Sequence, residues 1–170
     1  MKLLSVAIPC YNSEAYMRNC IHSLLAGGEE VEIIIVDDGS KDGTAAIADE
    51  YAEKYPTIVK AVHQENGGHG EAVNAGLRNA TGLYFKVVDS DDWVNAEAYE
   101  QILKTLEELI RGPKTVDLLI SNFVYEKQGI SHAVAKALYG EILNGSVTRL
   151  EQYAACAYGH FLKYGLELLE

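Results

Sequence analysis

The sequence contains few residues of the kinds that would place it outside ordinary globular proteins. Its 170 residues include three cysteines, three prolines and one tryptophan, and 25 acidic residues outnumber 14 basic ones. The cysteines (Cys10, Cys20 and Cys156) are odd in number, widely spaced and without metal-ligand spacing, so we expect reduced, buried thiols in a cytosolic protein. No cluster of lysine or arginine is present to bind a phosphate backbone, which argues against nucleic acid as a partner.

Long apolar runs are also missing. No stretch approaches the roughly 18 apolar residues that a membrane-spanning helix requires. The N-terminal run "LLSVAI" is too short for a signal peptide and lacks a cleavage site, so it predicts a strand. We therefore expect a protein of the cytoplasm or of the inner face of the membrane, with membrane association only through segments outside this sequence.

What is present is typical of one folded domain. Hydrophobic residues make up 48% of the chain and charged residues 23%, and no linker, repeat or low-complexity tract interrupts residues 1–170. A chain of this length buries roughly 70% of the surface that its unfolded form exposes, enough for a core without disulfides.

Short apolar runs alternate with segments of helical periodicity. The expected strands are 3–8, 31–36, 57–63, 83–88, 116–125 and 131–138; the expected helices are 13–25 (with Ser13 as N-cap), 44–55, 71–79, 96–110 and 148–164. Strands separated by helices of about ten residues predict right-handed βαβ units. The predicted fold class is α/β: three layers, α/β/α, around a mostly parallel central sheet.

Polar clusters follow each of the first four predicted strands, namely "PCYN", "DDGS", "HQENGGHG" and "DSDDW". Ligands of open α/β sheets bind outside the carboxyl ends of the strands. All four clusters are therefore predicted to line one binding edge.

The last cluster concentrates negative charge. If residues 83–91 stay extended, Asp89 and Asp91 point to the same side, about 6.6 Å apart. Their repulsion is about 2–3 kcal/mol at an effective dielectric of 20. A divalent cation, Mg²⁺ or Mn²⁺, relieves that repulsion and accepts carboxylate and phosphate oxygens together. The alternative is that Asp92 or Asn95 caps the next helix and the other carboxylates are solvated.

Two other clusters allow more than one interpretation. In "VDDGSKDG", Asp42 is expected to cap the following helix, whereas Asp37 or Asp38 is placed to accept N–H groups of a nucleotide base. The glycines of "NGGHG" suit a close backbone approach to phosphate oxygens at a helix N-terminus. His69 has no nucleophile beside it in the sequence, so it is either a ligand contact or incidental.

Taken in order, the stretches "VAIPCYN", "IIIVDDGSKDGT" and "ENGGHGEAVNAGLRNATGLYFKVVDSDDW" resemble the N-terminal, nucleotide-binding half of the family 2 inverting glycosyltransferases. Those enzymes have the Rossmann-like GT-A fold. The resemblance covers about residues 4–95 of the chain.

The resemblance implies a nucleotide-diphosphate sugar, usually a UDP-sugar, as donor and Mg²⁺ or Mn²⁺ as cofactor. It implies that Pro9 and Tyr11 line the base pocket, that Asp38 binds the base and that Asp89 lies near the ribose. It further implies a metal site at Asp91, with Asp89 and Asp92 as additional ligands. The remaining implied neighbours of the nucleotide-sugar are Asn66, Gly67, Gly68, His69 and Ser90.

The resemblance also implies transfer to a hydroxyl of a saccharide or lipid-linked acceptor, with inversion, in the synthesis of cell-surface polysaccharide or glycoconjugates. In the family, a carboxylate well after the acidic motif acts as general base. Glu141, Glu151 and Glu167 do not match its motif, so the catalytic base is unassigned. The expectation is a single family 2 domain over residues 1–170, truncated on the acceptor-binding side.

Two other classes also use acidic, metal-binding sites. A receiver-like signalling domain would need a lysine at a later strand end, and none follows "VDLLISNF". A sugar-phosphate nucleotidyltransferase would have a glycine-rich loop with a basic residue directly after the first strand, where this chain has "PCYNSE".

Overall fold

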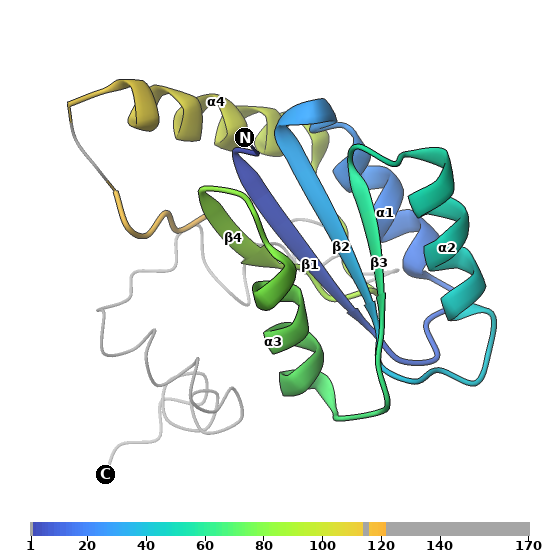
Figure 1. Ribbon diagram of the computed structural model, residues 1–170. Coiled ribbons are helices and arrows are strands. Elements are labelled where there is room, and N and C mark those ends of the chain that lie inside the picture. Colours follow the sequence, from blue (N-terminus) through green and yellow to red (C-terminus); the bar gives the residue numbers. More distant parts are fainter. Residues whose placement is uncertain (1, 114–115, 122–170) are drawn as a thin grey trace, which may run out of the picture. The chain divides into compact units, whose positions relative to one another are not determined.

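A computed structural model describes residues 2–113 and 116–121 of the chain (Figure 1). The helices and strands of the described residues lie within one compact unit, Met1–Leu119. The strands are β1 (Leu4–Cys10), β2 (Val31–Asp37), β3 (Val59–His63) and β4 (Tyr84–Val87); the helices are α1 (Met17–Leu25), η1 (Gly28–Glu30), α2 (Thr44–Lys54), α3 (His69–Asn79) and α4 (Ala96–Arg111).

The strands form one parallel sheet in the order β3-β2-β1-β4. β1 pairs with β2 on one side, with Ile8 opposite Ile35, and with β4 on the other, with Ala7 opposite Val87. Every residue of β1 and β2 is buried, as expected for strands covered on both faces. The predicted α/β architecture with a parallel sheet is confirmed for these residues.

Helices cover both faces of the sheet. Alternate residues of β1 and β2, among them Val6, Ile8 and Ile33, form one core with α1, α2 and α4. The opposite face, with Ile34 and Val36, packs against α3. Figure 1 shows α3 on the other side of the sheet from α1 and α2. The close approach of α3 depends on Gly76, because a Cβ there would lie 2.5 Å from the Cβ of Ala7.

Several predicted boundaries were wrong. Helix α1 begins at Met17, and Ser13 is not its cap, because the Ser13 Oγ instead accepts the N–H of Tyr11 at 3.2 Å. Helix α3 begins at His69, two residues before the predicted start. The chain is not extended through residue 91, since β4 ends at Val87 and the Asp92 N–H donates to the Asp89 carbonyl at 2.9 Å.

Two other predicted helix caps are confirmed by hydrogen bonds. Asn95 caps α4, accepting the N–H of Ala98 at 3.0 Å. Asp42 lies one residue before the cap position of α2 but accepts the N–H of Thr44 at 3.0 Å, so it serves the predicted helix end.

Beyond α4, the described residues 116–121 contain no strand, which contradicts the first part of the predicted strand 116–125. The rest of that strand, the predicted strand 131–138 and the predicted helix 148–164 lie outside the described residues, as does Cys156. Cys10 and Cys20 are buried free thiols, as expected. In the part of the chain that the structure covers, no helix combines the length and apolar character needed to cross a membrane.

A buried carboxylate joins the strands at the end opposite the predicted binding edge. Glu32 of β2 is 6% exposed and accepts the hydroxyls of Ser5 at 2.6 Å and Thr81 at 2.9 Å, together with the Thr81 N–H. The Lys60 ammonium lies 3.7 Å from its second oxygen. Glu32 therefore ties β1, β2 and β3 to the connection between α3 and β4.

Candidate functional site

A pocket of about 320 Å³ lies at the carboxyl ends of the strands. Its volume is at the lower end of the range for small-molecule sites. The loops after β1, β2 and β3 and the first turns of α3 form its walls. The predicted site residues that line it are Pro9, Tyr11, Asp38, Asn66, Gly68 and His69, and Cys10 and Ala72 complete the lining.

Asp38 is the buried charge of this pocket, at 2% exposure. Its Oδ1 accepts the side-chain amide of Gln64 at 2.7 Å and the N–H of Gly67 at 2.8 Å, and its Oδ2 accepts the N–H of Gly68 at 2.8 Å. Burial raises the pKa of the Asp38 carboxyl, but these three donors outweigh it and hold the pKa below its ordinary value. Asp38 is therefore a carboxylate at neutral pH.

The same bonds change the prediction for the glycine-rich loop. The N–H groups of Gly67 and Gly68 are directed at Asp38, so they are not free to bind phosphate oxygens. Gly68 has φ +84° and Gly39 has φ +71°, both in the region that favours glycine. A Cβ on Gly39 would also lie 2.9 Å from the Asn66 nitrogen, so glycine there lets the loop after β3 lie against the turn after β2.

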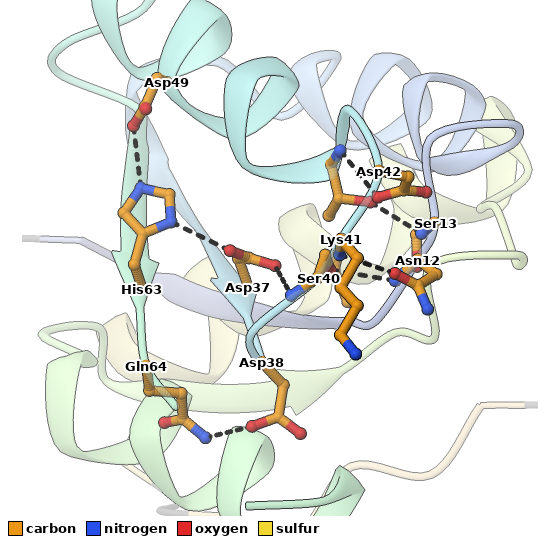
Figure 2. Close-up of polar contacts among 12 residues, drawn as sticks. Asn12, Ser13, Asp37, Asp38, Ser40, Lys41, Asp42, Asp49, His63 and Gln64 are labelled. Atoms are coloured by element: carbon orange, nitrogen blue, oxygen red, sulfur yellow. Dashed lines mark hydrogen bonds and ion pairs between the residues drawn. The ribbon is translucent and has the colours of Figure 1, made fainter. Parts of the chain in front are cut away.

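The loops after β1 and β2 are joined by reciprocal hydrogen bonds. The Asn12 N–H donates to the Ser40 hydroxyl at 3.0 Å, and the Asn12 Oδ1 accepts the Lys41 N–H at 2.9 Å (Figure 2). The Ser13 N–H donates to the Thr44 hydroxyl at 2.7 Å. Asn12 has φ +52°, a conformation that asparagine tolerates better than most residues. These bonds fix Tyr11 and Asp38, which flank the two loops, relative to each other.

Cys10 is excluded as a nucleophile although it lines the pocket. Burial, reinforced by the charge of Asp37, raises the pKa of the Cys10 thiol to about 12. The thiolate, which is the reactive form, is therefore negligibly populated at neutral pH.

Asp37 does not face the pocket's glycine loop. It is 5% exposed, accepts the Ser40 N–H at 3.0 Å and lies 3.3 Å from Nδ1 of His63. The Nε2 of His63 lies 2.9 Å from Asp49 of α2, so the imidazole bridges two carboxylates (Figure 2). The hydrogen bond with Asp49, and then that with Asp37, raise the pKa of His63 above its ordinary value, against the opposing effect of burial.

This bridge predicts a pH-dependent contribution to stability. Because the folded pKa of His63 is raised, its stabilising effect is fully present below about pH 6.5 and is lost as pH rises through the folded value. The imidazole is 43% exposed, so the effect is expected to stay below about 1 kcal/mol. Urea unfolding of wild type and His63→Gln should differ more at pH 5.5 than at pH 9. Asp49→Asn should reduce this pH dependence, and an equal difference at both pH values would contradict the assignment.

The acidic turn after β4 lies beside the pocket. The His69 imidazole is 3.8 Å from the Asp89 carboxylate, which links α3 to this turn. Ser90 is buried and its hydroxyl pairs with that of Ser13 at 2.9 Å, so Ser90 anchors the turn to the loop after β1 and does not line the pocket. Asp89, Asp91 and Asp92 are exposed.

The chemistry of this turn fits a hard divalent cation. Partial burial raises the pKa of Asp92 above its ordinary value, and the neighbouring charges of Asp91 and Asp89 raise it further. Within residues 2–113 and 116–121, no three side chains of His, Cys, Asp or Glu converge as a ligand set. Mg²⁺ is usually bound through one or two carboxylates, with waters and substrate phosphates as its other ligands. Two carboxylates of this turn would satisfy that requirement.

Several contacts of the site were not predicted from the sequence. These contacts join segments that are distant along the chain: Gln64 with Asp38, Ser13 with Ser90, and His63 with both Asp37 and Asp49. Only Asn12 carried a local signal, since asparagine is favoured where a non-glycine residue has positive φ.

The parallel α/β sheet has a pocket at its carboxyl edge, with a buried carboxylate and an acidic turn beside it, which is where open α/β domains bind their ligands. The model of the family described as glycosyl transferase family 2 matches residues 5–113. The chain belongs to this family.

Relatives and solved structures agree with that assignment. EpsH of Bacillus subtilis (strain 168) is 41% identical over 124 residues, which are 72% of this chain and 34% of EpsH. The crystal structure of S. aureus TarS 1–349 in complex with UDP-GlcNAc is similar with a TM-score of 0.56 and 35% identity, over 64% of this chain and 32% of that one. The mannosyltransferase PcManGT from Pyrobaculum calidifontis, in complex with GDP-Man and Mn²⁺, is similar with a TM-score of 0.54 and 25% identity, over 62% of this chain and 32% of that one.

These matches confirm the predicted family and its GT-A fold. The match covers about a third of the length of EpsH and of TarS 1–349.

Proposed function

We propose that this chain is the donor-binding part of a glycosyltransferase that uses a nucleoside-diphosphate sugar, with UDP as the nucleotide, and a divalent cation. The observation that carries the proposal is the pocket, which brings together residues from the ends of β1, β2 and β3 and from α3, with the acidic turn beside it. Two structural relatives support it, since one was solved with UDP-GlcNAc and the other with GDP-Man and Mn²⁺.

In this proposal, Pro9 and the half-exposed Tyr11 contact the base, and Asp38 accepts its N–H group. Tyr11 is 49% exposed, so a large part of its ring is free to stack on a ligand. Asn66, Gly67, Gly68 and His69 surround the nucleotide-sugar, with Gly67 acting through Asp38. Ser90 acts indirectly, because its hydroxyl holds the acidic turn through Ser13.

Asp91 and Asp89, with Asp92 as a further candidate, would hold Mg²⁺ or Mn²⁺ against the diphosphate. A bound dication supplies Lewis-acid stabilisation of the charge that develops on the departing phosphates. Such a counter-ion would offset the repulsion between a nucleoside diphosphate and the carboxylates at this edge.

The proposed reaction transfers the sugar to a hydroxyl of a saccharide or lipid-linked acceptor, with inversion at the anomeric carbon. The bond between the acceptor oxygen and the anomeric carbon forms while the bond to the diphosphate breaks. A general base takes the acceptor proton. Glu141, Glu151 and Glu167 lie outside the described residues and are not proposed for this role. A place in cell-surface polysaccharide or glycoconjugate synthesis is part of the same proposal.

Isothermal titration calorimetry tests donor binding directly. UDP and UDP-sugars are expected to bind the chain in the presence of Mn²⁺ or Mg²⁺ and at least about tenfold more weakly after chelation, because the diphosphate then faces the acidic turn without a counter-ion. Equal binding with and without the cation would contradict the metal part of the proposal. No binding of any nucleotide under either condition would contradict the proposal as a whole.

A further inference from the structure

Gln64 follows β3 directly, and its side chain points at Asp38 (Figure 2). The Gln64 N–H also donates to the Asp37 carbonyl at 3.0 Å, which fixes the backbone from which the side chain extends. The side-chain amide then reaches Oδ1 of Asp38 at 2.7 Å. Gln64 does not line the pocket, so it acts on a ligand only through Asp38.

The acceptor capacity of Asp38 is nearly used up by the protein. An ionised carboxylate offers about four lone-pair positions, two on each oxygen. Gln64 and Gly67 occupy both positions of Oδ1, and Gly68 occupies one position of Oδ2. One position remains, on Oδ2, and Figure 2 shows one carboxylate oxygen facing Gln64 and the other directed away from it.

We propose that Gln64 is a positioning residue that sets the base preference of the pocket by occupying Oδ1 of Asp38, so that the carboxylate accepts one N–H group and not two. This inference rests on the proposed function, in which Asp38 binds the base. Uracil presents a single N–H, at N3, between two carbonyl groups. Guanine presents two adjacent N–H groups, at N1 and N2, which together fit both oxygens of an unoccupied carboxylate.

Removing the Gln64 amide is expected to change this preference. Gln64→Leu keeps most of the side-chain volume but removes the donor to Oδ1, so that each oxygen of the carboxylate then has one unoccupied acceptor position. The affinity for UDP should fall about tenfold, the scale of one hydrogen bond to a charged group, because Asp38 loses an orienting donor. The ratio of UDP to GDP affinity should fall by about tenfold as well, since guanine gains a second acceptor.

Calorimetry with UDP and GDP in the presence of Mn²⁺ provides the test. Both nucleotides carry the same diphosphate and use the same cation, so their affinity ratio isolates the base contact from the metal site. Gln101→Leu is the matched control, because Gln101 is an exposed residue of α4 whose carbonyl, and not its side chain, is hydrogen-bonded. If Gln64→Leu does not fold, as judged by circular dichroism, Gln64→Asn serves instead. Its amide is one methylene too short to keep the 2.7 Å bond.

The outcomes separate the two proposals. A reduced UDP-to-GDP ratio in the Gln64 variant, with the wild-type ratio in the Gln101 variant, supports the inference. An unchanged ratio in a folded Gln64 variant overturns the inference and leaves the proposed function standing. Absence of nucleotide binding by the wild-type chain overturns both.

Discussion

Alanine in place of Asp91 is expected to reduce the Mn²⁺-dependent affinity for UDP by about a hundredfold or more. Removing residues that only support metal ligands typically costs 10–100-fold in metal affinity, so loss of a ligand itself should cost at least as much. The measurement is calorimetric titration of UDP into wild type and Asp91→Ala, with Mn²⁺ and after chelation. Without the cation both proteins should bind weakly, and the variant no more weakly than wild type, because it presents one carboxylate fewer to the diphosphate.

Asp117→Ala is the matched control. Asp117 is exposed and follows Val116, whose carbonyl accepts the Tyr84 hydroxyl at 3.0 Å at the start of β4, the opposite end of that strand from the acidic turn. The control variant should bind UDP as wild type does. If Asp91→Ala retained wild-type affinity in Mn²⁺, the assignment of the cation to this turn would be wrong.

Replacing Glu32 by leucine is expected to lower the free energy of unfolding by about 3 kcal/mol at pH 7, because buried donors left without an acceptor cost roughly 1–3 kcal/mol each. The substitution leaves the Ser5 hydroxyl and the N–H and hydroxyl of Thr81 without the carboxylate that they now share. Urea unfolding followed by circular dichroism measures the difference. Glu53→Leu, at an exposed position of α2, should change stability by less than about 0.5 kcal/mol.

The Glu32 effect should also depend on pH with a defined sign. Burial raises the pKa of Glu32, but the hydrogen bonds from Ser5 and Thr81 and the charge of Lys60 outweigh it, so the folded pKa lies below its ordinary value. Its contribution is therefore present above about pH 4.5 and is lost as pH falls through the folded pKa. The difference between wild type and Glu32→Leu should shrink in acid. A difference that is constant from pH 7 to pH 3 would show that packing, and not the carboxylate, stabilises this end of the sheet.

The order and type of the elements through α4 were predictable because their periodicities are strong and local. Continuous apolar runs such as "EIIIV" indicate strands buried on both faces, and the rule for carboxyl ends of parallel strands then places the polar clusters along one edge. Six of the predicted site residues indeed line one pocket. Asn95 was predictable as a cap because its side chain accepts an N–H group only three residues further along the chain, so the signal is local in the sequence.

What failed depends on contacts between distant segments. Ser13 is a good helix cap by type, but its hydroxyl is engaged by Tyr11 and Ser90, so α1 starts at Met17. The extended prediction for residues 83–91 missed the turn at Asp89, where pairing with β1 has already ended at Val87. The contact between Gln64 and Asp38 was not predicted because Asp38 lies 26 residues earlier in the sequence.

The position of β1 in the middle of the sheet also bears on how the polypeptide matures during translation. β1 is translated before β2, with which it pairs on one side, and its other side pairs only with residues 84–87, which follow much later. Until the ribosome has released that strand, a nascent chain carries an apolar strand with one row of unpaired backbone groups, a surface prone to intermolecular association. A translational pause before residue 84 would prolong that exposure.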